Sequence, residues 1–227
     1  MSANDQVVRH NLSLEGASSC FLCQAVRSTP VQVPWYSRPI ARSVGGAIAL
    51  ASLGALAPGH LLIAPVEHVF NTRSLGSDAR EDLAQFAGRV LAALERKFGD
   101  VTVFEHGSCF DDHTHRSACT EHAHIQLVPG SFNLDPDLST REAYGSLSDF
   151  LAADPGSEAP YLMLRNPGQP FCVFPDPGIS QYVRRLIASA LGEPDDWDYG
   201  VFPRTANVKA TAKMALDLVA TGASGTR

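Results

Sequence analysis

Two histidines and a glutamine near the middle of the chain alternate with apolar residues and could carry chemistry. His122, His124 and Gln126 are separated by single apolar residues, and the run from Ile125 to Val128 favours β-structure. Because side chains of a strand alternate between two faces, the three polar groups are predicted to share one face. A neutral imidazole is a competent nucleophile toward phosphorus near neutral pH, so this segment is a candidate catalytic strand.

A second group of reactive side chains lies near the start of the chain. Cys20 and Cys23 form a Cys-x-x-Cys pair, which is usually either a metal knuckle or a redox dithiol. Only a short segment, residues 24–29, separates this pair from Pro30. The local sequence therefore leaves both interpretations open.

The elements that must position these residues can be predicted from periodicity and turn residues. Two strands are expected at 45–50 and 60–65, the second stopped by a proline. An apolar stripe predicts a helix over 78–98, and a short strand follows at 101–106. Since only a polar loop separates this strand from the candidate catalytic strand, we expect the two to pair antiparallel.

The pattern changes after Pro129. Residues 130–160 hold several prolines and little apolar periodicity, which indicates a long excursion with one helix near 140–152. The remaining expected elements are a hairpin of 161–165 with 171–174 and helices at 180–191 and 206–219.

Composition excludes several classes of protein. The 227 residues are 44% hydrophobic and 19% charged, as in an ordinary globular chain, and the net charge of −6 argues against general nucleic-acid binding. No run of about 18 apolar residues exists, so no membrane span is expected. No signal peptide is apparent, and five cysteines do not suggest a disulfide framework. A cytoplasmic location is expected.

The segment His-Ala-His-Ile-Gln-Leu-Val resembles the signature of the histidine triad (HIT) superfamily. The His-x-His-x-Gln form is similar to that of two branches, galactose-1-phosphate uridylyltransferase and the dinucleoside polyphosphate phosphorylases. Gly59 to Pro65, followed by Glu67-His68, matches a second part of the pattern. The resemblance implies an α+β fold, with a HIT-like antiparallel sheet, flanking helices and a C-terminal extension, and a homodimer.

The resemblance also sets the expected domain boundaries. They are a loose N-terminal arm at 1–17, a HIT-like catalytic domain at 18–130, an extension packed on it at 131–220, and a disordered tail at 221–227.

The same resemblance implies a structural Zn²⁺ site. Its ligands would be Cys20, Cys23, His68 and His122, a donor set that zinc prefers. A reduced cysteine pair beside a surface His68 is the alternative interpretation. A competing local set ranks below the first one: Cys109, His113, His115 and Cys119.

His124 matches the nucleophile position of the superfamily. Gln126 cannot titrate, but it can hold a phosphoryl oxygen, which suits a leaving group that is already an acceptable anion. Backbone amides near Cys119 and Thr120 could cradle phosphate oxygens. His106, Arg116 and either Arg184 or Arg185 are further candidates for substrate contact. The usual Asn-Gly step of the family is replaced by Glu105-His106-Gly107.

These observations favour a zinc-containing nucleotidyltransferase. It would form a nucleotidyl-histidine intermediate from a nucleoside diphosphate sugar or a dinucleoside polyphosphate. One alternative is a HIT-type hydrolase or phosphorylase, in which water or phosphate is the acceptor. Another is a non-catalytic nucleotide-binding zinc protein, and a dithiol redox enzyme is the weakest. The expected partner is a nucleotide conjugate.

Overall fold

The computed structural model describes residues 20–27, 33–109, 122–153 and 159–222. The side chains of 215–222 are outside this description. The arm expected at 1–17 therefore lies outside the described residues, as does most of the expected tail, because the last helix runs to Gly222.

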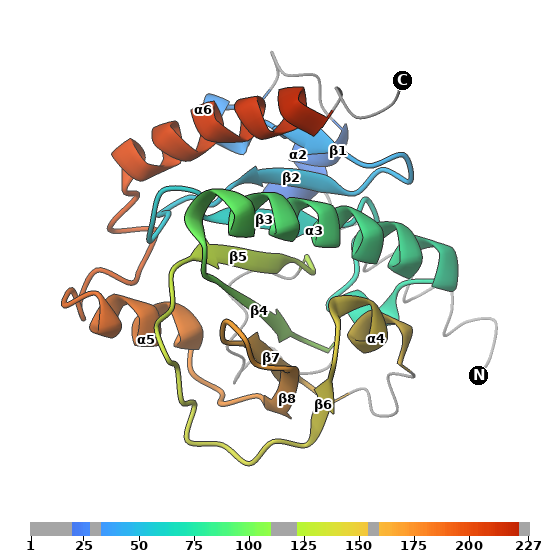
Figure 1. Ribbon diagram of the computed structural model, residues 1–227, viewed down its shortest axis with the longest axis vertical. Coiled ribbons are helices and arrows are strands. Elements are labelled where there is room, and N and C mark those ends of the chain that lie inside the picture. Colours follow the sequence, from blue (N-terminus) through green and yellow to red (C-terminus); the bar gives the residue numbers. More distant parts are fainter. Residues whose placement is uncertain (1–19, 28–32, 110–121, 154–158, 223–227) are drawn as a thin grey trace.

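One antiparallel sheet of eight strands organises the described chain, in the order β1-β2-β3-β5-β4-β7-β8-β6 (Figure 1). Its strands are β1 (Ala41–Arg42), β2 (Ile48–Ala51), β3 (Leu61–Ala64), β4 (Val101–Gly107), β5 (Ile125–Pro129), β6 (Glu142–Tyr144), β7 (Tyr161–Arg165) and β8 (Phe171–Pro175). β5 is central, and Gln126 lies opposite Leu62 of β3 and opposite Phe104 of β4. This register sets which side chains can meet on each face.

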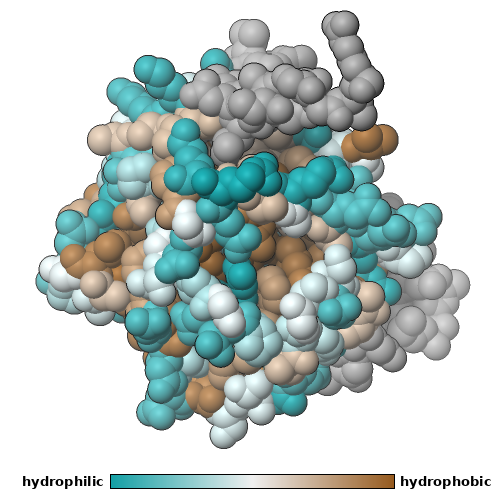
Figure 2. All heavy atoms as spheres, viewed as in Figure 1, coloured by the Kyte–Doolittle hydropathy of each residue, from teal (hydrophilic) through white to brown (hydrophobic). Residues whose placement is uncertain are grey.

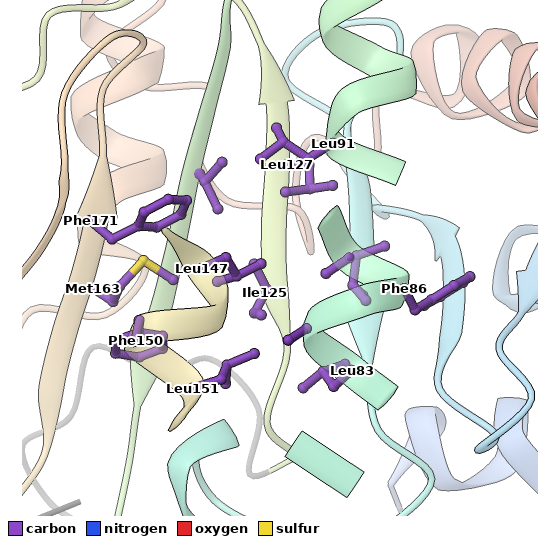
Figure 3. Close-up of a cluster of buried hydrophobic side chains, with 14 of the residues drawn as sticks. Leu83, Phe86, Leu91, Ile125, Leu127, Leu147, Phe150, Leu151, Met163 and Phe171 are labelled. Atoms are coloured by element: carbon purple, nitrogen blue, oxygen red, sulfur yellow. The ribbon is translucent and has the colours of Figure 1, made fainter. Parts of the chain in front are cut away.

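One face of the sheet is apolar and packs under two helices. α3 (Ser77–Phe98) and α4 (Leu147–Ala152) cover the side chains of Ile125, Leu127 and their neighbours (Figure 3). In the space-filling view, hydrophilic side chains gather over the outer surface of α3 (Figure 2). The helix is therefore an amphipathic scaffold element, as its sequence predicted.

The opposite face carries two separate apolar clusters. α2 (Phe21–Arg27) covers Leu50 and Leu62 on β2 and β3. α5 (Tyr182–Ala190) covers Phe104 and Leu162 on β4 and β7. β5 lies between β3 and β4, and on this face its Val128 packs into the cluster under α5. Gln126 of β5 and His124, directly before the strand, lie between the two clusters.

The expected α+β class with an antiparallel sheet and flanking helices is confirmed. The predicted helix over 140–152 is wrong in its first half, where β6 forms and only α4 is helical. The strands after residue 130 extend the same sheet. α6 (Thr205–Gly222) lies against β1, β2 and the 3₁₀ turn η1 (Trp35–Ser37), and a second 3₁₀ turn, η2 (Thr72–Ser74), precedes α3. None of the described helices is both long and apolar enough to cross a membrane.

Candidate active site and metal centre

Four potential metal ligands converge from three distant parts of the chain. Cys20 directly precedes α2 and Cys23 lies in its first turn, while His68 follows β3 and His122 approaches β5. Their ligand atoms all lie within 4.8 Å of one another. The Cys23 Sγ is 3.1 Å from His68 Nδ1 and 3.4 Å from His122 Nδ1, and the Cys20 Sγ is 3.7 Å from His122 Nδ1.

These distances fit a tetrahedral ion. Zn–S bonds near 2.3 Å and Zn–N bonds near 2.1 Å place adjacent S and N ligands about 3.6 Å apart. His122 Nε2–H donates to the Pro65 carbonyl oxygen at 3.0 Å, so Nδ1, which faces the two cysteine sulfurs, carries no proton and can act as a ligand. Burial lowers the pKa of His122 to about 4, so its ring is neutral at pH 7. The Cys₂His₂ cluster can therefore hold a metal ion.

The thiols are free cysteines, not a disulfide. Burial and the adjacent Cys20 raise the pKa of Cys23 to about 12, so without a cation it is a thiol at neutral pH. A bound cation deprotonates such a group. Two histidines completing the donor set favour the metal interpretation of the Cys-x-x-Cys pair over the redox one.

A row of hydrogen bonds next to the cluster fixes the tautomer of the candidate nucleophile. The Leu56 backbone N–H donates to His60 Nδ1 at 3.2 Å, so the proton of this neutral ring is on Nε2. That N–H donates to Gln126 Oε1 at 2.9 Å, which turns the Gln126 amide nitrogen toward His124 Nε2 at 3.4 Å. His124 Nδ1–H donates to the His122 carbonyl oxygen at 2.9 Å. His124 Nε2 therefore carries a lone pair and no proton.

Burial keeps the imidazoles of this row neutral. It lowers the pKa of His124, and the Arg184 cation lowers it further, although the bond to the His122 carbonyl acts in the opposite direction. The pKa of His60 lies well below its ordinary value, chiefly because of burial and secondly because of Arg184. The neutral form is the one that a nucleophilic histidine requires.

His124 and Gln126 line a cavity of about 230 Å³, which we call the His124 cavity. Its other lining residues are mainly apolar or aromatic: Phe21, Tyr36, Ser37, Leu50, Ala51, Ser52, Leu53, Leu62, Arg184 and Tyr199. Arg184 is the charged residue among these twelve, and none of them is a carboxylate. The cavity thus combines flat aromatic surfaces with a cation, which suits the base and phosphate of a nucleotide.

Arg184 reaches the cavity from α5, and its side chain is only 2% exposed. Its Nη2 donates to the Gly54 carbonyl at 2.6 Å and its Nε to the Trp197 carbonyl at 3.0 Å. The neighbouring Arg185 lies over the Trp197 ring, 3.4 Å from its centroid, and does not line the cavity. Of the two candidate arginines, the structure places Arg184 at the site.

Other expected contacts fall differently. His106 is buried on β4, and its Nε2 has no hydrogen-bond partner among the residues that the structure describes. Burial and His124 lower its pKa to about 3. It does not line the His124 cavity, so its expected substrate contact stays a prediction. Several candidates lie outside the described residues: Arg116, Cys119 and Thr120 of the expected substrate site, with His113 and His115 of the competing metal set.

His60 was not among the site residues expected from the sequence. The signal that could have found it is the pairing of β3 with β5. Since Leu62 lies opposite Gln126, His60 is on the same sheet face, two residues along.

Comparison with known proteins supports a family assignment. Residues 13–134, more than half of the chain, match the family described as proteins similar to the CwfJ C-terminal. The chain belongs to this family. The match includes all four cluster cysteines and histidines, with His60, His124 and Gln126, whereas Arg184 and Tyr199 lie beyond it. No curated protein matches the chain.

Solved structures give weaker likenesses. A zinc-bound histidine triad family protein from Mycobacterium smegmatis is 16% identical, with 80% of this chain and 99% of that chain covered, at a TM-score of 0.36. A HIT-like protein from Bartonella henselae is also 16% identical, with 43% and 68% covered, at a TM-score of 0.35. A hypothetical protein from Leishmania major is 18% identical, with 50% and 74% covered, at a TM-score of 0.39.

Proposed function

We propose that this chain transfers a nucleotidyl group through a covalent nucleotidyl-His124 intermediate. The observation that carries the proposal is the unprotonated Nε2 of His124 at the wall of the His124 cavity. The hydrogen-bond row keeps the His124 ring in the tautomer in which this nitrogen has its lone pair. In the first step, the Nε2 lone pair forms a bond to the α-phosphorus of a nucleotide conjugate. The bond from phosphorus to the leaving oxygen breaks, and the leaving group departs as an anion.

In the second step, an acceptor attacks the same phosphorus and the N–P bond breaks, which restores His124. The Gln126 amide N–H that contacts Nε2 at rest becomes a donor to a phosphoryl oxygen once Nε2 is bonded to phosphorus. Because an amide cannot supply a proton, the leaving group must be stable as an anion, as phosphates are. This favours a nucleoside diphosphate sugar or a dinucleoside polyphosphate as the donor.

Arg184 is the proposed cation for the negative charge of the substrate. Its guanidinium is fixed by two backbone carbonyls, so little conformational entropy is lost when it binds an anion. It also disfavours protonation of His124, which preserves the nucleophile.

The Cys₂His₂ cluster is the proposed site of a structural zinc ion. All four protein ligands of a closed tetrahedral site are present, which leaves no position for substrate. His122 connects this cluster to the chemistry, because its carbonyl oxygen accepts the proton of His124 Nδ1. The cytoplasm, where thiols stay reduced, is the proposed compartment.

Mass spectrometry of the intact protein tests the proposal. Wild type and His124→Ala are incubated with a panel of nucleoside diphosphate sugars and dinucleoside polyphosphates. Wild type alone is expected to gain the mass of a nucleoside monophosphate, and that mass identifies the base. An adduct on both proteins would refute His124 as the nucleophile.

Substrate consumption without an adduct would indicate a fast second step, and transfer to water or to phosphate would then separate a hydrolase from a phosphorylase. Binding of the panel without adduct or consumption would contradict the transferase and favour a non-catalytic nucleotide-binding zinc protein.

A further inference from the structure

A second hollow continues from the His124 cavity toward the protein surface. We call it the Trp35 groove. It has a volume of about 400 Å³ and is lined by Trp35, Tyr36, Leu53, Tyr199, Gly200, Pro203, Thr205 and Val208. Tyr36, Leu53 and Tyr199 also line the His124 cavity, so these three side chains form a wall common to both hollows. A ligand longer than the cavity can therefore continue into the groove.

The groove presents aromatic surface to solvent. The side chains of Trp35 and Tyr36 are 40% and 38% exposed, and their rings meet edge to face with centroids 5.7 Å apart. The Lys209 ammonium lies 5.8 Å from the centroid of the Trp35 ring. Exposed aromatic rings beside a cation are the features with which proteins stack nucleobases and neutralise the attached phosphate. No lining residue of the groove is a carboxylate.

The walls of the groove come from several segments that pack against the rest of the fold. Trp35 and Tyr36 belong to η1, which lies against α2, β2 and α6. The opposite wall is held by the Gly54 N–H, which donates to the Pro203 carbonyl at 3.0 Å. Gly54 has a φ of +65° and a Cβ there would overlap Tyr199, so this wall depends on a glycine. The groove is thus largely formed before any ligand binds.

The size of the cavity indicates what the groove is for. A volume of about 230 Å³ lies below the roughly 300–1,000 Å³ typical of sites that enclose a whole small-molecule ligand. One nucleoside fills such a space, and the rest of a larger ligand must lie outside it. On the side of the common wall, that outer space is the Trp35 groove.

We propose that the Trp35 groove binds the second nucleobase of a dinucleotide whose first nucleoside occupies the His124 cavity. The second base stacks on Trp35 and Tyr36, and Lys209 neutralises a nearby phosphate. This inference rests on the proposed function, because it takes a nucleotide as the occupant of the cavity. It selects dinucleotides over nucleoside diphosphate sugars as substrates, since a sugar has no aromatic face to stack.

The test uses the fluorescence of Trp35. The chain has two tryptophans, and Trp197 lines neither hollow, so Trp197→Phe leaves Trp35 as the reporter. This variant is titrated with a nucleoside diphosphate, a dinucleoside tetraphosphate and a 3′–5′-linked dinucleotide. At least one dinucleotide is expected to quench Trp35 and to bind more tightly than the nucleoside diphosphate. The one that does so identifies how the two nucleosides are joined.

Calorimetric titration of Trp35→Ala measures the contribution of stacking, with Ile179→Ala as the control because Ile179 is an exposed apolar residue that lines neither hollow. A stacked base contributes about 1–3 kcal/mol, so Trp35→Ala is expected to weaken dinucleotide binding about 5- to 150-fold. Its affinity for the nucleoside diphosphate and that of the control are expected to stay within about twofold of wild type. Equal weakening for both classes of ligand, or no weakening for either, would overturn the proposal, as would failure of every dinucleotide to quench Trp35.

These measurements detect binding and need no turnover. If the proposed transfer is wrong but the groove is right, the dinucleotide still quenches Trp35 and no adduct forms on His124. If the transfer is right but the groove is wrong, the adduct forms and Trp35→Ala binds the dinucleotide as wild type does.

Discussion

Replacement of Glu105 by glutamine should make the protein less sensitive to pH. Glu105 lies on β4, on the sheet face opposite the active site, and is fully buried. Its carboxylate accepts hydrogen bonds from the backbone N–H of Thr72 at 2.7 Å and from the Thr72 hydroxyl at 2.6 Å. Burial nevertheless dominates and raises the pKa of Glu105 from 4.5 to about 7.

The sign of the effect follows from the two pKa values. Between pH 4.5 and pH 7 the folded protein holds the Glu105 proton and the unfolded chain does not, so stability falls as pH rises through this window. The stability that the folded protein has while Glu105 is protonated is fully present below pH 4.5 and is lost as the pH rises through 7. At about 1.36 kcal/mol per pH unit the whole effect is about 3 kcal/mol, of which about 2.5 kcal/mol falls between pH 5 and pH 8.

The assay is urea unfolding of wild type and Glu105→Gln at several pH values, with zinc at a constant concentration. Glutamine does not ionise, so the free energy of unfolding of the variant relative to wild type is expected to rise by about 2.5 kcal/mol from pH 5 to pH 8. Taking this difference cancels the titration of the cysteines and histidines. Gln85→Asn, which changes an exposed side chain of α3 and leaves the ionisable groups in place, is the control and should differ from wild type by the same amount at every pH. A difference for Glu105→Gln that stays constant with pH would refute the reasoning.

Three further changes test the two parts of the site. Cys23→Ser should lose bound zinc, as measured by elemental analysis. At a free zinc concentration 1,000-fold above the Kd of wild type, it should also lose about 4 kcal/mol of the free energy of unfolding, whereas Cys172→Ser should keep both the zinc and the stability. Equal zinc in the two variants would contradict the cluster. His60→Leu leaves the buried Leu56 N–H and the Gln126 side-chain carbonyl oxygen without their partner, at a cost of about 1–3 kcal/mol each. This variant should slow adduct formation at least tenfold, and an unchanged rate would show that His60 does not orient Gln126. Arg184→Lys should lower kcat/KM about 10- to 100-fold while Arg185→Lys leaves it unchanged, and equal kinetics would remove Arg184 from the site.

The short-range features of the site could be predicted from the alternation of residue types. The shared face of His124 and Gln126 follows from a period of two, and the structure keeps both on it. The start of the strand could not be predicted this way. β5 begins only at Ile125, because the Ala123 N–H donates to the Val69 carbonyl at 2.7 Å and so pairs this stretch with the loop that carries His68.

The long-range features needed the fold. His60 lies 66 residues from Gln126 in the sequence, and only the register of β3 against β5 shows that they meet. Arg184 was one of two adjacent candidates, and periodicity alone did not decide which of them faces the cavity. Only the family resemblance predicts that the four cluster residues meet, because ligand gaps of 45 and 54 residues carry no local signal.

One donor in the hydrogen-bond row belongs to the main chain. The N–H of Leu56 fixes the proton of His60 on Nε2 and thereby the orientation of the Gln126 amide, while the His122 carbonyl oxygen holds the proton of His124. Among the amino acids, only proline lacks the backbone N–H. Nineteen of the twenty amino acids at position 56 would therefore supply the same donor. The orientation of Gln126 beside His124 thus depends on the backbone conformation between β2 and β3. Position 56 can therefore be substituted without loss of this hydrogen bond, as long as the backbone keeps its course.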